Sequence, residues 1–350
     1  MAPFIEIAGR RVGPGRPTYI IAEMSANAPR FEDAARIIEA ARDAGADAVK
    51  LQTYRPDTIT IDCDAEPFRV RGTLWEGETL YRLYARASTP WEWQPRLKAI
   101  AEGLGLALFS TPFDDSAVDF LEALDMPAYK IASFEVVHVP LLRRVAKTGR
   151  PVILSTGMAT LDEIREALCA LEEAGGGSVA LLKCTSAYPA PPEEMNLRTI
   201  PDLAATFGVP VGLSDHTLDL AVPVAAVALG ACLIEKHLTL SRAAGGPDSA
   251  FSLEPDEFRA MVREVRTAER ALGTVYYGVS SREEETRIFR PSLFVVQDVR
   301  RAAVFTAENV RVIRPGHGLH PRHLAEVLGR RAARDVVRGT PLTWDMVEGD

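Results

Sequence analysis

Cysteine is scarce in this sequence, and its residues lie far apart. The four are Cys63, Cys169, Cys184 and Cys232, and no two of them form a C-x-x-C pair. Four dispersed thiols in 350 residues exclude a disulfide scaffold. They fit a reducing compartment, so we expect the protein in the cytoplasm.

Long hydrophobic runs and an excess of basic residues are also missing. No window approaches the roughly 20 apolar residues of a membrane span, and residues 1–10 lack the pattern of a signal peptide. Lys and Arg number 40 against 48 Asp and Glu, which gives a net charge of −8. We therefore expect neither a nucleic acid nor a membrane as partner. An anion would have to be bound locally, by a few placed donors or a metal.

A regular alternation fills the chain up to Tyr277. Short runs rich in Val, Ile and Leu alternate with longer amphipathic stretches, and such runs are typical of parallel strands buried on both faces. We predict eight strands: Tyr19–Glu23, Asp47–Gln52, Leu106–Ser110, Ala128–Ala132, Val152–Thr156, Val179–Cys184, Val209–Leu213 and Cys232–His237. Eight β-then-α units over roughly 250 residues predict an α/β fold of the (β/α)₈ or TIM-barrel type. An open doubly wound sheet is the alternative, but residues 22–27 lack the Gly-rich turn that often follows its first strand.

Three helices have clear signals. Phe31–Ala44 has apolar residues at helical spacing and stops before Gly45. Thr160 and Glu163 form a capping-box pattern that starts a helix to Glu173, and the last long helix is Glu254–Leu272.

Two segments depart from the barrel pattern. Residues 5–17 predict a small hairpin around Gly13-Pro14-Gly15, which we expect to plug the barrel. The connection over residues 54–90 is too long for an ordinary loop, and such loops are usually functional or disordered. We expect an ordered lid, because it carries three large aromatic residues: Trp75, Tyr81 and Tyr84.

The pattern changes near Tyr277. Residues 280–286 are polar and charged, and beyond them short strands and turns replace long helices, with a strand at Ser292–Val299 and a short helix near Leu324–Leu328. We therefore predict a barrel domain with its hairpin over residues 1–276, a linker over 277–290 and a small β-rich domain over 291–350. A domain of that size has a marginal core, so we expect it to dock on another surface.

Polar side chains stand at the carboxyl ends of the predicted strands, where barrel enzymes have their active sites. Lysines and hydroxyls there would cradle a phosphate or carboxylate. His216 and His237 follow adjacent strands and could converge on Mn²⁺, Co²⁺ or Zn²⁺, while Glu23 and Glu135 are acid–base candidates. A Schiff base remains a rival use for three lysines: Lys50, Lys130 and Lys183.

Several motifs together resemble one family. They are IAEMSAN, AVKLQTY, FSTPFD, AYKIASFE, ILSTGMAT, KCTSAYP, GLSDHT, IEKHLTLSRAAGGPDSAFSLEP and RPGHGLHP. In this order they resemble the sialic acid synthase family, most closely its pseudaminic acid branch. The resemblance implies a (β/α)₈ barrel followed by an antifreeze-like (SAF) domain, in a homodimer whose SAF domain covers the partner's barrel.

The resemblance also implies a reaction. Phosphoenolpyruvate would add through C3 to the aldehyde of a 2,4-diacetamido-2,4,6-trideoxyhexose in its altrose form, water would attack C2, and phosphate would leave by C–O cleavage. The implied ligands of a divalent metal, Mn²⁺ with Co²⁺ or Mg²⁺ as alternatives, are His216 and His237. Glu23 and Glu135 would handle protons and water. Implied phosphoenolpyruvate contacts are Lys50, Thr111, Lys130, Ser133, Ser155, Ser186 and Ser214; implied sugar contacts are Gln52, Tyr188, Asp248 and Arg314.

Two positions depart from the family pattern. Asn27-Ala28 stands where the family usually has Asn-His, and Ser186 stands where sialic acid synthases have Asn. Three other functions stay open: an N-acetylneuraminate or legionaminate synthase with the same chemistry, a Schiff-base aldolase, and a non-catalytic sugar-binding protein.

Overall fold

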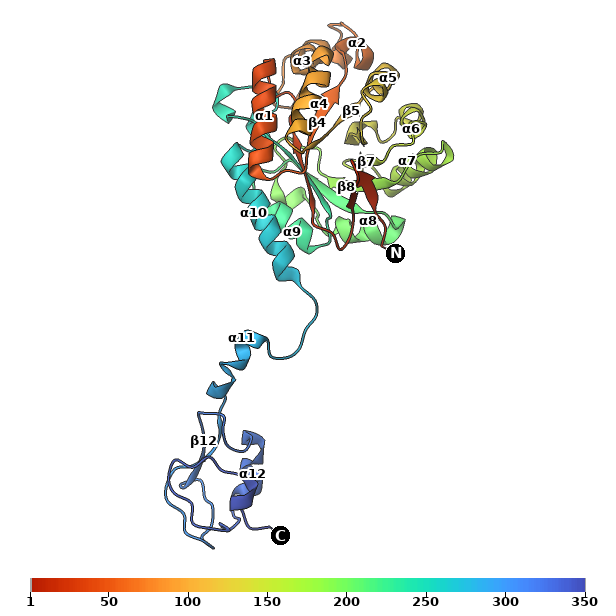
Figure 1. The fold of residues 1–350 in the computed structure, drawn as a ribbon. Coiled ribbons are helices and arrows are strands. Elements are labelled where there is room, and N and C mark those ends of the chain that lie inside the picture. The colour runs from red at the N-terminus through yellow and green to blue at the C-terminus, as the bar shows by residue number, and fades with distance from the viewer. Residues whose placement is uncertain (1, 350) are drawn as a thin grey trace. The chain divides into compact units, whose positions relative to one another are not determined.

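A computed structural model gives the fold over residues 2–349, which form two compact units (Figure 1). The first unit ends at Gly273 and the second begins at Thr274. Each has a hydrophobic core of its own. Across residues 2–349, every helix is too short or too polar to cross a membrane.

The first unit is a closed barrel of eight parallel strands, which confirms the predicted fold class. Strand β10 pairs with β3 and so closes the ring. Two strands have the predicted bounds, and the other six differ from the prediction by one or two residues at one or both ends. The barrel strands are β3 (Tyr19–Glu23), β4 (Ala48–Thr53), β5 (Ala107–Pro112), β6 (Tyr129–Ile131), β7 (Val152–Ser155), β8 (Val179–Cys184), β9 (Val211–Asp215) and β10 (Leu233–His237).

Helices connect the strands and cover the outside of the barrel (Figure 1). The helix predicted to stop at Gly45 does so, because Gly45 takes a left-handed conformation with φ of 89°. Thr160 and Glu163 form the predicted capping box. The helices are α1 (Phe31–Ala44), α2 (Pro56–Ile59), α3 (Leu80–Ala87), α4 (Gln94–Gly103), α5 (Asp115–Ala123), α6 (Val139–Ala146), α7 (Leu161–Glu173), α8 (Thr199–Phe207), α9 (Ala221–Ala228) and α10 (Pro255–Leu272).

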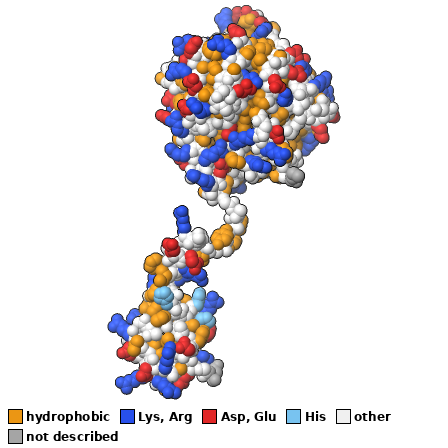
Figure 2. Space-filling view, viewed as in Figure 1, with side chains coloured by type: hydrophobic (Ala, Val, Ile, Leu, Met, Phe, Trp, Pro, Cys, Tyr) orange, Lys and Arg blue, Asp and Glu red, His pale blue; other side chains and the backbone are white. Residues whose placement is uncertain are grey.

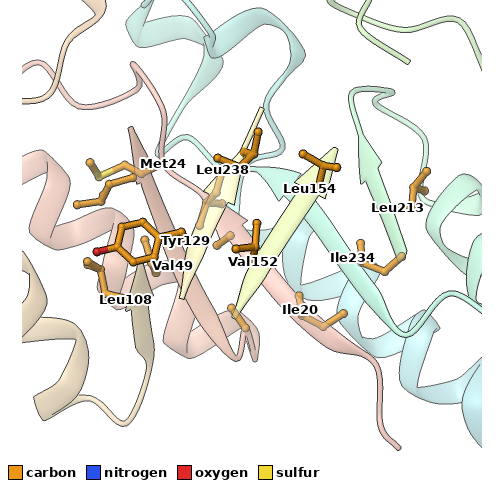
Figure 3. Close-up of a cluster of buried hydrophobic side chains, with 14 of the residues drawn as sticks. Ile20, Met24, Val49, Leu108, Tyr129, Val152, Leu154, Leu213, Ile234 and Leu238 are labelled. Atoms are coloured by element: carbon orange, nitrogen blue, oxygen red, sulfur yellow. The ribbon is translucent and has the colours of Figure 1, made fainter. Parts of the chain in front are cut away.

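The barrel unit has two apolar layers. Outward-facing strand residues such as Val49, Leu154 and Ile234 belong to the larger cluster, which packs between strands and helices (Figure 3). Inward-facing residues form a second cluster with the hairpin of β1 (Ile5–Ile7) and β2 (Arg10–Val12). The hairpin therefore plugs the barrel, as predicted.

The hairpin turn lies elsewhere than predicted. It falls at Ala8 and Gly9, both with positive φ, and not at Gly13-Pro14-Gly15. Two central residues with positive φ match the twist of a two-residue hairpin. Gly13 instead passes close to the preceding chain, where a Cβ would lie 2.5 Å from the Pro3 carbonyl oxygen.

The predicted lid, residues 54–90, contains helices α2 and α3 and a 3₁₀ turn at Glu66–Phe68. Its aromatic residues have different surroundings. The Tyr81 hydroxyl donates to Asp57 within the segment, and Tyr84 packs edge-on against Tyr54. Trp75 contacts Tyr188 and the Pro247 carbonyl, which lie in the loops after β8 and β10.

The second unit contains β11 (Ser292–Val295) paired antiparallel with β12 (Val310–Ile313), and the short helices α11 (Ser281–Glu284) and α12 (Leu324–Val327). Its core includes Leu293, Phe305 and Leu342. The predicted strand ends at Val295, four residues early. Helix α11 forms inside the predicted linker because Ser280 and Glu283 make a capping box.

The surface of each unit mixes charges of both signs. Figure 2 shows basic and acidic side chains interspersed on the visible face. Many of them pair, as in the bridge from Arg144 to Glu122 at 3.0 Å. Exposed pairs of this kind contribute little to stability.

Candidate active site

Each barrel strand contributes one inward polar side chain to the layer directly above the apolar plug. On seven strands this residue comes two positions after an inward apolar residue, as Glu23 follows Ile21, because side chains of a strand alternate between faces. All eight side chains are almost fully buried. They are Glu23, Lys50, Thr111, Lys130, Ser155, Cys184, Ser214 and Glu235. Six of them are among the residues predicted from the sequence; Cys184 and Glu235 are not.

Two lysines and two carboxylates form the centre of this layer. Lys50 Nζ lies 2.6 Å from a Glu23 oxygen and donates to the Thr111 hydroxyl at 3.3 Å. Glu235 Oε1 lies 3.2 Å from Lys130 Nζ and 3.7 Å from Lys50 Nζ. The carboxylates therefore hold both ammonium groups in place inside the barrel.

The two lysines have opposite pKa shifts. Burial lowers the pKa of Lys50, but the nearby charges of Glu23 and Glu235 outweigh it and raise the pKa. For Lys130, burial dominates, and the pKa falls below its usual range. Lys50 is thus a fixed positive charge, and Lys130 is the more readily neutralised of the two.

A hydroxyl cradle lies beside the lysines. The backbone N–H of Gly157 donates to Ser133 Oγ at 3.1 Å. A Cβ on Gly157 would overlap the Ser186 hydroxyl and lie 2.8 Å from Ser133 Oγ. The Ser155 hydroxyl is buried and has no protein partner. Hydroxyl and backbone donors in this arrangement suit an anion such as phosphate.

Glu135 is the carboxylate best suited to exchange a proton near neutral pH. Burial raises its pKa from 4.5 to about 7, against a smaller opposing effect of a backbone hydrogen bond and Lys130. Its Oε2 atom is buried without a hydrogen-bond partner. A general base works best when its pKa lies near the operating pH.

His216 and His237 lie together, with ring centroids 5.4 Å apart. His216 Nδ1 donates to the Thr185 carbonyl at 2.9 Å, so Nε2 is the ring nitrogen that could bind a cation. His237 Nδ1 is buried without a partner, and burial, then the charges of His216 and Lys50, lower the His237 pKa well below its usual value. A cation requires an unprotonated imidazole nitrogen, which the neutral His237 provides and which His216 would provide once it loses its proton, so the pair fits a divalent metal. Within residues 2–349 no group of three His, Cys, Asp or Glu side chains forms a metal site.

Cys184 lies beside the histidines, with Sγ 3.9 Å from His216 Nδ1. Burial raises the pKa of the thiol, but the charge and hydrogen bond of His216 outweigh it and lower the pKa to about 6. Conversely, burial lowers the pKa of His216, and the Cys184 charge outweighs it and raises that pKa.

The predicted sugar contacts of the barrel gather at one edge of this site. Gln52 Nε2 donates to Glu23 at 3.1 Å and to Ser25 Oγ at 3.0 Å, and Ser25 in turn donates to Asp248. Tyr188 stacks against His216 at a centroid distance of 4.4 Å. Ser25, which the sequence did not single out, therefore links two predicted contacts.

Ala28 lines a cavity of about 180 Å³ at this edge, with Ser25 and Pro247 among the other lining residues. Ala28, which stands where the family usually has His, thus borders open space. Its neighbour Asn27 donates to the Leu238 carbonyl at 3.1 Å and so ties the loop after β3 to the loop after β10.

Two lysines near the ends of barrel strands do not point into this site. Lys183 donates to the Cys184 carbonyl at 2.6 Å and lies on the opposite strand face from the Cys184 side chain. Lys236 is fully buried and pairs with Asp215 at 2.6 Å, between barrel and helices. Arg314 belongs to the second unit, where it follows β12 and is exposed.

Comparisons with known proteins identify the family of this chain. The NeuB family matches residues 37–277, and the SAF domain matches residues 290–348. The chain is 41% identical to the pseudaminic acid synthase of Helicobacter pylori (95% of this chain, 98% of that protein) and 44% identical to that of Campylobacter jejuni (93% and 96%). The crystal structure of an N-acetylneuraminic acid synthetase from Leptospira borgpetersenii superposes with a TM-score of 0.72 at 31% identity, covering 82% of this chain and 95% of that one.

Proposed function

The chain belongs to the NeuB family, and we propose that it is a pseudaminic acid synthase. The reaction is the condensation of phosphoenolpyruvate with 2,4-diacetamido-2,4,6-trideoxy-L-altrose and water, giving pseudaminic acid and phosphate. The observation that carries this proposal is the convergence, inside one barrel, of an anion cradle, a pair of histidines and Glu135.

Phosphoenolpyruvate lies at the lysines and the hydroxyl cradle. Lys50 and Lys130 neutralise its negative charge, and Ser133, Gly157 and Ser186 surround its phosphate. Thr111, Ser155 and Ser214 supply further donors from neighbouring strands. When phosphoenolpyruvate binds, its negatively charged groups replace the carboxylates of Glu23 and Glu235 as partners of the two lysines.

The sugar lies between the histidines and the edge formed by Gln52, Tyr188 and Asp248. His216 and His237 would hold a divalent cation, with Mn²⁺ preferred and Co²⁺ or Mg²⁺ as alternatives. Such a cation, when bound, supplies Lewis-acid polarisation of the aldehyde.

Two carboxylates manage the protons. C3 of phosphoenolpyruvate forms a bond to the aldehyde carbon, and the aldehyde oxygen takes up a proton. Water attacks C2, and Glu135 accepts the proton that this water loses. The C2–O bond to phosphate then breaks, phosphate leaves with the bonding electron pair, and the C2 hydroxyl releases its proton as the C2 carbonyl forms. Glu23, whose pKa burial raises, lies beside Lys50 and Gln52 and supplies the proton that the aldehyde oxygen takes up.

Arg314 and the SAF domain complete the proposal. The enzyme acts as a homodimer in which the SAF domain of one chain covers the partner's barrel, and Arg314 donates to an N-acetyl oxygen of the sugar bound there. The proposed location is the cytoplasm.

The test is phosphate release from phosphoenolpyruvate with a panel of hexosamines. We expect the L-altrose substrate to react and N-acetylmannosamine and the legionaminate precursor to react poorly; the reverse ranking would favour the related synthases. With phosphoenolpyruvate labelled with ¹⁸O at C2, the label should leave with phosphate. Label retained in the sugar acid would contradict C–O cleavage.

A Schiff-base aldolase remains the alternative of another class, because Lys130 is a buried lysine with a lowered pKa. Borohydride reduction in the presence of pyruvate distinguishes the two. Covalent trapping at Lys130 would support the aldolase, and the synthase predicts none.

A further inference from the structure

Trp75 is the part of the lid that reaches the proposed sugar site. It is half-buried, and its indole N–H donates to the Pro247 carbonyl at 2.9 Å. Pro247 directly precedes Asp248, one of the proposed sugar contacts. The Trp75 ring lies 6.0 Å from the ring of Tyr188, another proposed contact. The lid therefore contacts one proposed sugar contact, Tyr188, and the residue that precedes another, Asp248, in two different strand-end loops.

Trp75, Tyr188 and Phe251 pack together as a cluster of three rings, which we call the aromatic wall; Trp75 and Tyr188 are partly exposed, and Phe251 is buried beneath them. Trp75 meets Phe251 edge-on at 6.5 Å, and Tyr188 lies 5.0 Å from Phe251. At its inner end the wall contacts the histidines, since Phe251 lies 5.0 Å from His237. The wall thus runs from the proposed aldehyde position to the lid.

The outer end of the wall offers little to a hydroxyl group. The single donor of Trp75 is already used by the Pro247 carbonyl, so the ring presents only carbon and hydrogen to a ligand. A hydroxyl pressed against it would lose water without gaining a partner, whereas a methyl group would bury apolar surface. A methyl group is therefore the favoured neighbour of Trp75.

We propose that Trp75 is a specificity-determining residue that selects a sugar ending in a methyl group over one ending in a hydroxymethyl group. This inference rests on the proposed function, in which the aldehyde carbon lies at the histidines. In an open-chain hexose C6 is the carbon farthest from C1, so it lies toward the lid. The Trp75 ring thereby contacts the methyl group at C6.

The test compares two acceptors, 2,4-diacetamido-2,4,6-trideoxy-L-altrose and its 6-hydroxy counterpart. Wild-type kcat/KM should favour the 6-deoxy sugar by about 10- to 100-fold, the usual range for discrimination by an apolar surface. Trp75→Ala should reduce the preference to less than about 3-fold and leave the KM for phosphoenolpyruvate unchanged. Trp75→Phe retains an apolar ring and should keep most of the preference.

Trp91 provides a matched control. Its indole N–H also donates to a backbone carbonyl, that of Tyr54 at 3.1 Å, but its ring packs on Phe120 and not on the aromatic wall. Trp91→Phe should leave the preference at its wild-type value. The proposal would be overturned if Trp75→Ala kept the wild-type preference. It would also be overturned if kcat/KM fell equally for both sugars and the KM for phosphoenolpyruvate rose.

Binding of the two reduced sugars, which cannot react, separates this inference from the proposed function. Calorimetry should show tighter binding of the 6-deoxy alditol to wild type and nearly equal binding of both to Trp75→Ala. If wild type releases phosphate with neither sugar, the proposed function fails, and the alditol affinities still decide the role of Trp75. Equal alditol affinities in wild type would reject that role.

Discussion

Replacing Glu135 with Gln should inactivate the protein and make it more stable at alkaline pH. Burial raises the pKa of this carboxyl from 4.5 to about 7. Between these values the unfolded chain has lost the proton and the native chain still holds it. Native stability therefore falls as pH rises through this window, because the native state binds more protons than the unfolded state.

The magnitude follows from the width of the window. A difference of about 2.5 pH units at about 1.4 kcal/mol each corresponds to about 3 kcal/mol. Gln resembles the protonated side chain and avoids this cost. Glu135→Gln should therefore be more stable than wild type by about 1 kcal/mol at pH 5 and about 3 kcal/mol at pH 8.

The assay is urea-induced unfolding followed by near-ultraviolet circular dichroism at the two pH values. Glu166→Gln, at an exposed position on α7, is the control and should change stability by less than about 0.5 kcal/mol at either pH. Phosphate release by Glu135→Gln should fall at least about 100-fold, and wild-type kcat/KM should rise with pH around an apparent pKa near 7. A stability difference that does not grow between pH 5 and pH 8 would refute the raised pKa, and an active Glu135→Gln would refute its role as base.

Three further predictions concern the cradle, the histidines and the second unit. Gly157→Ala should raise the KM for phosphoenolpyruvate about 10-fold or more, because its Cβ would overlap Ser186 Oγ; Gly103→Ala, where a Cβ meets nothing within 4 Å, should leave KM unchanged. A chelator should abolish phosphate release and Mn²⁺ or Co²⁺ should restore it, whereas full activity of the metal-free protein would exclude the metal. Arg314→Ala and His216→Ala homodimers should be nearly inactive, but their co-refolded mixture should recover about a quarter of wild-type activity. An inactive mixture that contains mixed dimers by mass spectrometry would place Arg314 in its own chain's site or in none.

The barrel could be predicted because its signals are local. Apolar runs of strand length and the caps at Gly45 and Thr160 each depend on a few neighbouring residues. The hairpin turn could not, because an alanine at positive φ gives no turn signal, whereas Gly13-Pro14-Gly15 gives a strong one. Trp75 was noticed only as an aromatic residue in a long loop, since its partner Pro247 lies 172 positions away.

Only part of the candidate site could be predicted, because the sequence does not show which residues of a strand point inward. Side chains alternate between the faces of a strand, but a strand buried on both faces is apolar throughout, so its sequence does not show which residues point inward. The strand sequences therefore do not distinguish Lys50 and Lys130 from Lys183. The first two face the barrel interior, and Lys183 faces away from it. Glu235 was missed although it lies two residues before His237, on the same face.

Two short segments, Ser-Asp-His at 214–216 and Glu-Lys-His at 235–237, place side chains on both faces of the barrel wall. Asp215 and Lys236 point outward from adjacent strands, face each other in register and form a fully buried ion pair. Losing one member would leave a buried charge without compensation, at a cost of about 3–5 kcal/mol. This pair fixes β9 against β10, and alternation then directs the neighbouring histidines inward, where they meet. The outward residues of the motifs thus position the inward residues, and the site depends on both.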